Sequence, residues 1–222
     1  MATQRRFDAV LFDLDGVLTD SEPWWDDVRI QFARAHDRPW THDDQHAVMG
    51  ANSAEWAATM QSRLRLDHIP VDVIEDAIVD GMVERYRTQA SPVIAGAPEA
   101  VRRIAASRPV AIASSSHRRV IDAAVDALGL HGVFGAVVSS DDVPSGKPAP
   151  DVYLRAAGLL GVPATRCLIV EDSLNGVRAG IAAGAFVVLV PNPSVPPAGD
   201  ARERADLVLE RLADLDPDAL PA

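Results

Sequence analysis

Six short apolar segments are spaced along the chain, and segments with helical periodicity lie between most of them. Continuous apolar strands that alternate with amphipathic helices are typical of a parallel sheet covered on both faces. The pattern therefore predicts an α/β fold with a Rossmann-like, doubly wound parallel sheet. The predicted strands are 7–12, 109–113, 133–138, 167–170, 186–190 and 207–209, and the predicted helices are 98–106, 118–128, 151–160 and 174–183.

Residues 21–90 depart from this alternation because they contain no convincing strand. Apolar residues recur there at helical spacing, which predicts three or four helices. We expect these helices to form a cap inserted after the first strand, so that residues 1–20 and 91–222 form the Rossmann-like core. The cap helices are predicted at 24–35, 54–66 and 71–86, the hinges at 20–23 and 90–95, and a fraying end from about residue 214.

Charge and composition narrow the range of partners. The net charge of −11 disfavours binding to nucleic acid or to anionic membranes. No apolar run approaches the roughly 18–20 residues of a membrane span. The single cysteine, Cys167, lies in an apolar segment, so we interpret it as a small core residue and expect a reducing, cytoplasmic environment.

Polar side chains follow four of the predicted strands at the point where each strand ends. In an open parallel sheet, ligands bind outside the carboxyl ends of the strands. Carboxylates gathered there raise each other's pKa unless a cation is present, and Mg²⁺ prefers such oxygen ligands. The sequence thus predicts a magnesium site with hydroxyl groups and an ammonium nearby, formed by Asp13, Asp15, Ser114, Ser115, Ser116, Lys147, Glu171 and Asp172.

The spacing of Asp13 and Asp15 before Gly16 suits a nucleophile and a general acid/base. A carboxylate can attack phosphorus and form an acyl phosphate, and the second carboxyl group can then protonate the leaving alkoxide and activate water. Lys147, the single lysine beside twenty arginines, can neutralise phosphate oxygens. From the residues alone, Ser114–Ser116 are also consistent with a helix cap, and Glu171–Ser173 with an acidic helix N-terminus.

Four segments, in chain order, resemble the four motifs of the haloacid dehalogenase-like superfamily. They are the run FDLDGVLTD at 12–20, Ser114 after its apolar strand, Lys147 in the run GKPAPD, and the run VEDSLNG at 170–176. Together they span nearly the whole chain. The helical insertion after the first motif resembles the cap of the β-phosphoglucomutase-like phosphatase branch.

This resemblance implies a magnesium-dependent hydrolase of a small phosphate monoester, for example a sugar phosphate, with a phospho-aspartate intermediate. Asp13 would be the nucleophile and a metal ligand, and Asp15 the acid/base with its carbonyl on the metal. Ser114 and Lys147 would hold the phosphoryl group. Asp172 would bind Mg²⁺, with Glu171 as a further ligand or its supporting partner. The expected substrate-binding residues are Gly16, Ser115, Ser116, His117 and Asn175.

Departures from the family pattern bear on which reaction is expected. The dehalogenases lack the second aspartate, which is present here as Asp15. The mutases carry a histidine after the first motif and a cap arginine, whereas residues 20–25 and 50–53 here contain neither. A phosphatase is therefore favoured over a phosphomutase, and the inserted helices disfavour a receiver-like signalling domain. We expect a monomer that acts on a small phosphorylated metabolite.

Overall fold

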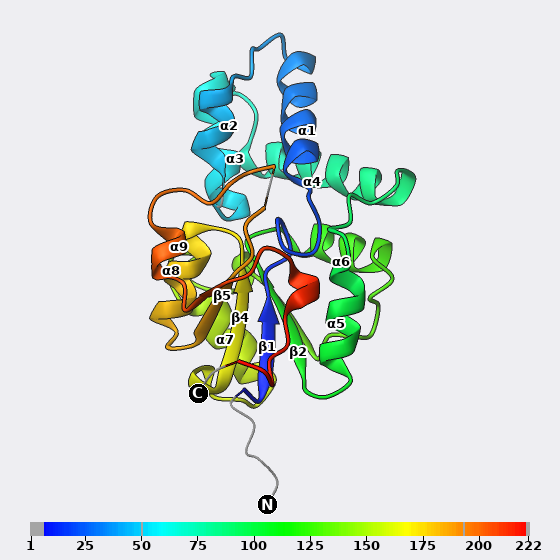
Figure 1. The fold of residues 1–222 in the computed structure, drawn as a ribbon. Helices are drawn as coiled ribbons and strands as arrows, with labels where there is room; N and C mark the ends of the chain where they lie inside the picture. The colour runs from blue at the N-terminus through cyan, green and yellow to red at the C-terminus, as the bar shows by residue number, and fades with distance from the viewer. Residues whose placement is uncertain (1–6, 50, 193, 221–222) are drawn as a thin grey trace, which may run out of the picture.

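The computed structural model describes residues 7–49, 51–192 and 194–220, so Gly50 of the 50–53 segment lies outside the described residues. These residues contain a six-stranded parallel sheet with the strand order β3-β2-β1-β4-β5-β6 (Figure 1). The predicted doubly wound α/β class is confirmed. The strands are β1 (Ala9–Phe12), β2 (Val110–Ser114), β3 (Ala136–Ser139), β4 (Cys167–Glu171), β5 (Phe186–Leu189) and β6 (Leu207–Val208).

Alternating side chains of the buried strands face two separate apolar layers. In β1, Val10 and Phe12 pack in the layer that includes helices α5 and α6, whereas Ala9 and Leu11 pack in the layer that includes α7, α8 and α9. All four β1 residues are buried, as a central parallel strand requires. The helices are α5 (Ala97–Ala105), α6 (Arg118–Ala127), α7 (Asp151–Leu159), α8 (Leu174–Ala182) and α9 (Ala201–Arg204), with short 3₁₀ turns at Ser140–Asp142, Ala164–Arg166 and Leu212–Asp214.

Four further helices lie beyond the carboxyl ends of the strands (Figure 1). Two of them begin with capping boxes, in which the side chains of Thr41 and Asn52 accept hydrogen bonds from the amides of Asp44 and Glu55. Two linkers connect this helical part to the sheet. They lie side by side, since Thr19 of one linker forms an antiparallel bridge with Val93 of the other. The helices are α1 (Glu22–Ala35), α2 (His42–Val48), α3 (Ser53–Leu64) and α4 (Val71–Thr88).

The structure corrects two details of the prediction. The third strand begins at Ala136 rather than at 133, because the chain turns around Gly132 before it enters the sheet. The expectation of a fraying end is wrong as far as residue 220: Leu215 is fully buried, and Asp218 pairs with the buried Arg108 at 2.5 Å. An apolar anchor outweighs the Pro- and Asp-rich composition there.

The expectation for the single cysteine agrees with the described residues. Cys167 is fully buried, and burial raises the pKa of its thiol to about 11, which suits a core residue. Within 7–49, 51–192 and 194–220, no helix has both the length and the apolar character needed to cross a bilayer.

Candidate active site

The order of the strands brings the predicted site residues to one edge of the sheet. Central β1 lies between β2 and β4, and its neighbours end at Ser114 and Glu171. Asp13 follows β1 directly, and its amide donates to the carbonyl of Val170 at 3.0 Å, which extends the β1–β4 ladder by one bond. The side chains that end three neighbouring strands therefore converge on the side that faces the cap helices.

Lys147 links two of these strand ends. Its Nζ donates to Oδ1 of Asp13 and to Oε1 of Glu171, both at 2.6 Å. The ammonium also lies 5.0 Å from the centre of the Tyr153 ring. Burial lowers the pKa of Lys147, but the two carboxylates outweigh this effect and hold the pKa above its ordinary value. Lys147 is therefore a fixed, buried positive charge.

Both oxygens of the Glu171 carboxylate accept hydrogen bonds from protein donors. Oε1 accepts from Lys147 and from the hydroxyl of Tyr153 at 2.5 Å, and Oε2 accepts from the amides of Asp172 and Ser173 and from the Ser173 hydroxyl. Burial raises its pKa, yet Lys147 and these donors hold the pKa below its ordinary value. At Gly176, a Cβ would overlap this carboxylate, so glycine leaves the space that Glu171 needs. Glu171 thus holds Lys147 in place.

Asp13, Glu171 and Asp172 bring three carboxylates together, with ligand oxygens within 4.8 Å of one another. Burial raises the pKa of Asp13 to about 8; Lys147 opposes this rise, while Glu171 and Asp15 add to it. Burial, followed by Glu171 and Asp13, also raises the pKa of Asp172 well above its ordinary value. A hard divalent cation favours such oxygen donors and relieves their repulsion, so Asp13 and Asp172 fit Mg²⁺, while the oxygens of Glu171 are occupied by protein donors.

Gly16, which the sequence assigned to substrate binding, lies against the carboxylate of Asp172. Its φ of +85° lies in the left-handed region, and a Cβ there would overlap the Asp172 carboxylate. The tight turn after Asp15 and the close approach of Asp172 therefore both require glycine at this position.

Asp15 is held by hydroxyl groups from two sides. Its Oδ1 accepts from Ser21 and, at 3.3 Å, from the indole of Trp25, both at the start of the cap. Its Oδ2 accepts from the hydroxyl of Ser116 at 2.6 Å and from that of Ser114 at 3.4 Å. The sequence did not predict these partners. The second carboxyl group of the first motif is thus fixed where core and cap meet.

A cavity of about 760 Å³ lies between the strand ends and the cap helices. The loop after β5 completes its wall, and Asn192 and Ser194 tie that loop to Asp20 with hydrogen bonds of 3.1 and 2.5 Å. Of the predicted site residues, the core side contributes Asp13, Asp15, Ser114, Ser115, Ser116, Lys147, Asp172 and Asn175 to the lining. The cap side contributes the two tryptophans Trp25 and Trp56. It also contributes polar residues that the sequence did not single out as site residues: Glu22, Asp26, Arg29, His42, Gln45 and His46.

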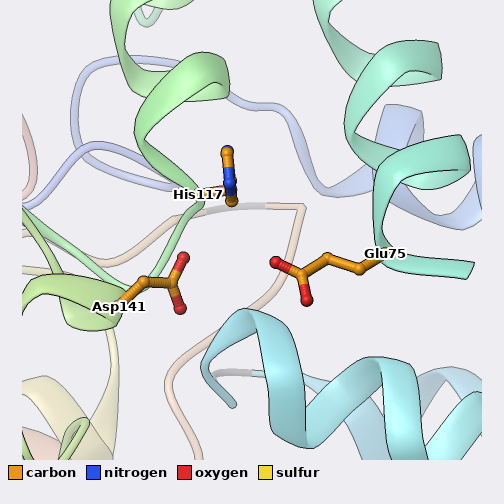
Figure 2. Close-up of side chains that lie close together, drawn as sticks. All are labelled: Glu75, His117 and Asp141. Carbon is orange, nitrogen blue, oxygen red and sulfur yellow. The ribbon is translucent and has the colours of Figure 1, made fainter. Parts of the chain in front are cut away.

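His117, which the sequence assigned to substrate binding, is not part of this lining. Figure 2 shows it turned toward Glu75 of α4 and Asp141 of the turn after β3. Its Nδ1 accepts from the amide of Arg119 at 3.1 Å, so in the neutral ring Nε2 carries the proton and is a donor. Asp141 in turn accepts from the amide and hydroxyl of Ser53 at 3.0 and 2.7 Å. These groups form a polar contact between cap and core.

Arg29 is the cavity residue that sequence reasoning missed most clearly, because an arginine was sought only at 50–53. Its one visible sign is position: Arg29 follows Trp25 by four residues and Val28 by one, within the buried face of α1. A charged residue in an apolar helical stripe is unusual enough to mark a candidate site. Tyr153, on the buried face of α7, gave no comparable sign.

The chain resembles known hydrolases in sequence. The family model described as haloacid dehalogenase-like hydrolase matches residues 7–184. Hexitol phosphatase B of Escherichia coli (strain K12) is 30% identical over 230 residues, which cover 97% of each chain. Fructose-1-phosphate phosphatase YqaB of the same organism is 29% identical over 185 residues, which cover 81% of this chain and 94% of YqaB.

Solved structures show the same fold. β-Phosphoglucomutase from Clostridium difficile has a TM-score of 0.80 at 19% identity, with 95% of this chain and 93% of the other covered. Some curated relatives are longer, and the chain spans 18% and 54% of the length of two from Arabidopsis thaliana.

The chain belongs to the haloacid dehalogenase-like hydrolase family, since the match covers well over half of its length. Within this family it is a phosphatase, a hydrolase of phosphoric monoesters. Its fold is shared with the β-phosphoglucomutase-like members.

Proposed function

We propose that this protein hydrolyses a small phosphate monoester, a sugar phosphate or a related metabolite, through a phosphorylated Asp13. The observation that carries this proposal is the buried Lys147, whose Nζ lies 2.6 Å from both Asp13 and Glu171. A fixed ammonium beside a carboxylate can neutralise an incoming phosphoryl group without reorganisation. Two phosphatases that resemble this chain are named hexitol phosphatase and fructose-1-phosphate phosphatase.

The first step transfers the phosphoryl group. An oxygen of the ionised Asp13 attacks phosphorus, the bond from phosphorus to the leaving oxygen breaks, and protonated Asp15 gives its proton to that oxygen. Ser114 and Lys147 hold the phosphoryl oxygens. Asp13, Asp172 and the carbonyl of Asp15 would hold Mg²⁺, which would supply charge that offsets the carboxylates and the phosphate.

The second step releases phosphate. Asp15, now a carboxylate, removes a proton from water, which attacks phosphorus and frees Asp13. The hydroxyl groups of Ser21 and Ser116 orient Asp15 during both steps.

Residues 21–90 act as the cap that excludes bulk water and selects the leaving group, and residues 1–20 and 91–222 act as the core. A monomeric, cytoplasmic enzyme remains our expectation.

The proposal is tested with para-nitrophenyl phosphate and an acid quench. The wild type should hydrolyse this ester only with Mg²⁺ and should yield a phosphorylated protein on quenching. Asp13→Asn should abolish both, because an amide neither attacks phosphorus nor carries the phosphoryl group. Asp15→Asn should keep substrate affinity, form the phospho-enzyme slowly and turn over poorly. Full activity of Asp13→Asn would refute the mechanism.

A further inference from the structure

Arg29 lies in the cap wall of the cavity and is held on several sides. It is 5% exposed. Its guanidinium carbon lies 5.1 Å from the ring centre of Trp25 and 5.6 Å from that of Trp56, so two indoles flank it. Its Nη1 donates to Oε1 of Gln45 at 3.1 Å, and the indole of Trp40 donates to the same oxygen at 3.4 Å. The position of the guanidinium is therefore fixed before any ligand binds.

The hydrogen-bonding capacity of Arg29 is only partly used. Among the residues that the structure describes, its buried Nε has no acceptor and its guanidinium forms no ion pair with a carboxylate. Buried polar groups are normally hydrogen-bonded, so this donor calls for an explanation, and an acceptor that arrives with a ligand is one that fits a residue of the cavity wall. The fixed guanidinium thus points to a ligand group at the cap end of the cavity.

The surrounding charge decides which kind of group fits. Glu22 and Asp26 also line the cavity from α1, and they act on Arg29 through space. Burial raises the pKa of Glu22 to about 7, Asp15 adds to this rise, and Arg29 opposes it. Since two carboxylates already offset the guanidinium, a second anionic group on the substrate would be repelled. Hydroxyl groups match this wall, because each can accept from Arg29 and donate to Glu22.

We infer that Arg29, Gln45 and Glu22 form a subsite that binds the hydroxyl groups of an uncharged, polyhydroxylated leaving group. The preferred substrate is then a sugar or sugar alcohol with one phosphate and no further anionic group. This inference rests on the proposed function, since the phosphoryl group must occupy the other end of the same cavity. The cavity of about 760 Å³ has room for both parts.

The experiment compares the values of kcat/KM for sorbitol 6-phosphate, which carries hydroxyl groups, and para-nitrophenyl phosphate, which does not. In Arg29→Met, a change of similar size, we expect the ratio of the two values to fall at least tenfold, mainly through the KM for sorbitol 6-phosphate. Gln45→Leu should shift the ratio in the same direction because Arg29 loses its support. The matched control, Arg34→Met, alters an exposed arginine of the same helix and should keep the wild-type ratio within twofold. Thermal melting establishes that each variant is folded.

The outcomes separate the inference from the proposed function. If the wild type hydrolyses both esters and Arg29→Met keeps their ratio within twofold, the subsite is refuted while the phosphatase stands. A wild type that prefers fructose 1,6-bisphosphate or phosphoglycolate to sorbitol 6-phosphate also refutes the subsite, because this wall should repel a second anion. A wild type inactive on every ester with Mg²⁺ refutes the proposed function and the inference together.

Discussion

Replacing Gly176 by alanine tests how tightly the Glu171 carboxylate is fixed. Gly176 is buried in the first turn of α8, where a Cβ would overlap that carboxylate. The carboxylate is fully buried and accepts five hydrogen bonds, one of them from Lys147. Either it or the helix must shift. Because separating a buried ion pair costs about 3–5 kcal/mol, we expect Gly176→Ala to lose at least about 3 kcal/mol of unfolding free energy.

The same shift should impair catalysis, since it moves the ammonium of Lys147 relative to Asp13. A misplacement of about 1 Å costs about 100-fold, so kcat for para-nitrophenyl phosphate should fall by about that factor in Gly176→Ala. Urea denaturation gives the free energy and steady-state kinetics gives kcat.

Gly158→Ala is the matched control for this substitution. Gly158 lies on the exposed side of α7, and a Cβ there would meet no atom within 4 Å. The control should gain about 0.5–1 kcal/mol, because alanine favours the helix, and it should keep full activity. If Gly176→Ala matched Gly158→Ala in both stability and kcat, the reasoning about Glu171 would be wrong.

Three further predictions use other parts of the molecule. Because the pKa of Glu22 is raised to about 7, the stability of the wild type falls as pH rises from about 4.5 to 7. Glu22→Gln should therefore stabilise the metal-free protein by up to about 3 kcal/mol at pH 8.5 and by much less near pH 5, as urea titrations at both pH values would show. Tyr153→Phe removes one donor to Glu171 and should cost about 1.5–3 kcal/mol in the same assay, and an unchanged value would count against that contact. Leu215→Ala should cost about 2–5 kcal/mol because the C-terminal segment is packed, whereas a loss below 0.5 kcal/mol would indicate a loose end.

Much of the fold was predictable because its main physical requirement, apolar residues in the central strands, is visible in short segments of the sequence. A central parallel strand must be apolar on both faces, and the four residues of β1 are all apolar. The strand ends then locate the carboxylates, so the meeting of Asp13 with Glu171 and Asp172 could be expected from topology. Lys147 lies in the loop after β3, and its place in the site was expected from its rarity and from the family resemblance. The start of β3 was harder to predict, since Val133 and Phe134 are apolar residues of the loop before β3, and the apolar pattern alone cannot distinguish them from a strand.

The roles of several site residues could not be derived from sequence because they depend on side-chain direction. His117 follows the serines of β2, yet it turns away from the cavity to Glu75 and Asp141. Glu171 was expected as a metal ligand or a supporting partner, and only the hydrogen-bond geometry shows that both of its oxygens are occupied by protein donors. Arg29 lies in the cavity wall between two indoles from different helices, an arrangement that no local sequence pattern predicts.

The two ends of the cavity hold their positively charged side chains in different ways. At the strand ends, Lys147 is paired with carboxylates that follow β1 and end β4, so its position is determined by the register of the sheet. At the cap end, Arg29 is fixed by neutral groups and keeps an unused donor. A paired charge resists displacement, whereas an unpaired donor gains from each acceptor offered to it. Substitutions at the first end should therefore change kcat for every ester, and substitutions at the second should change which ester is preferred.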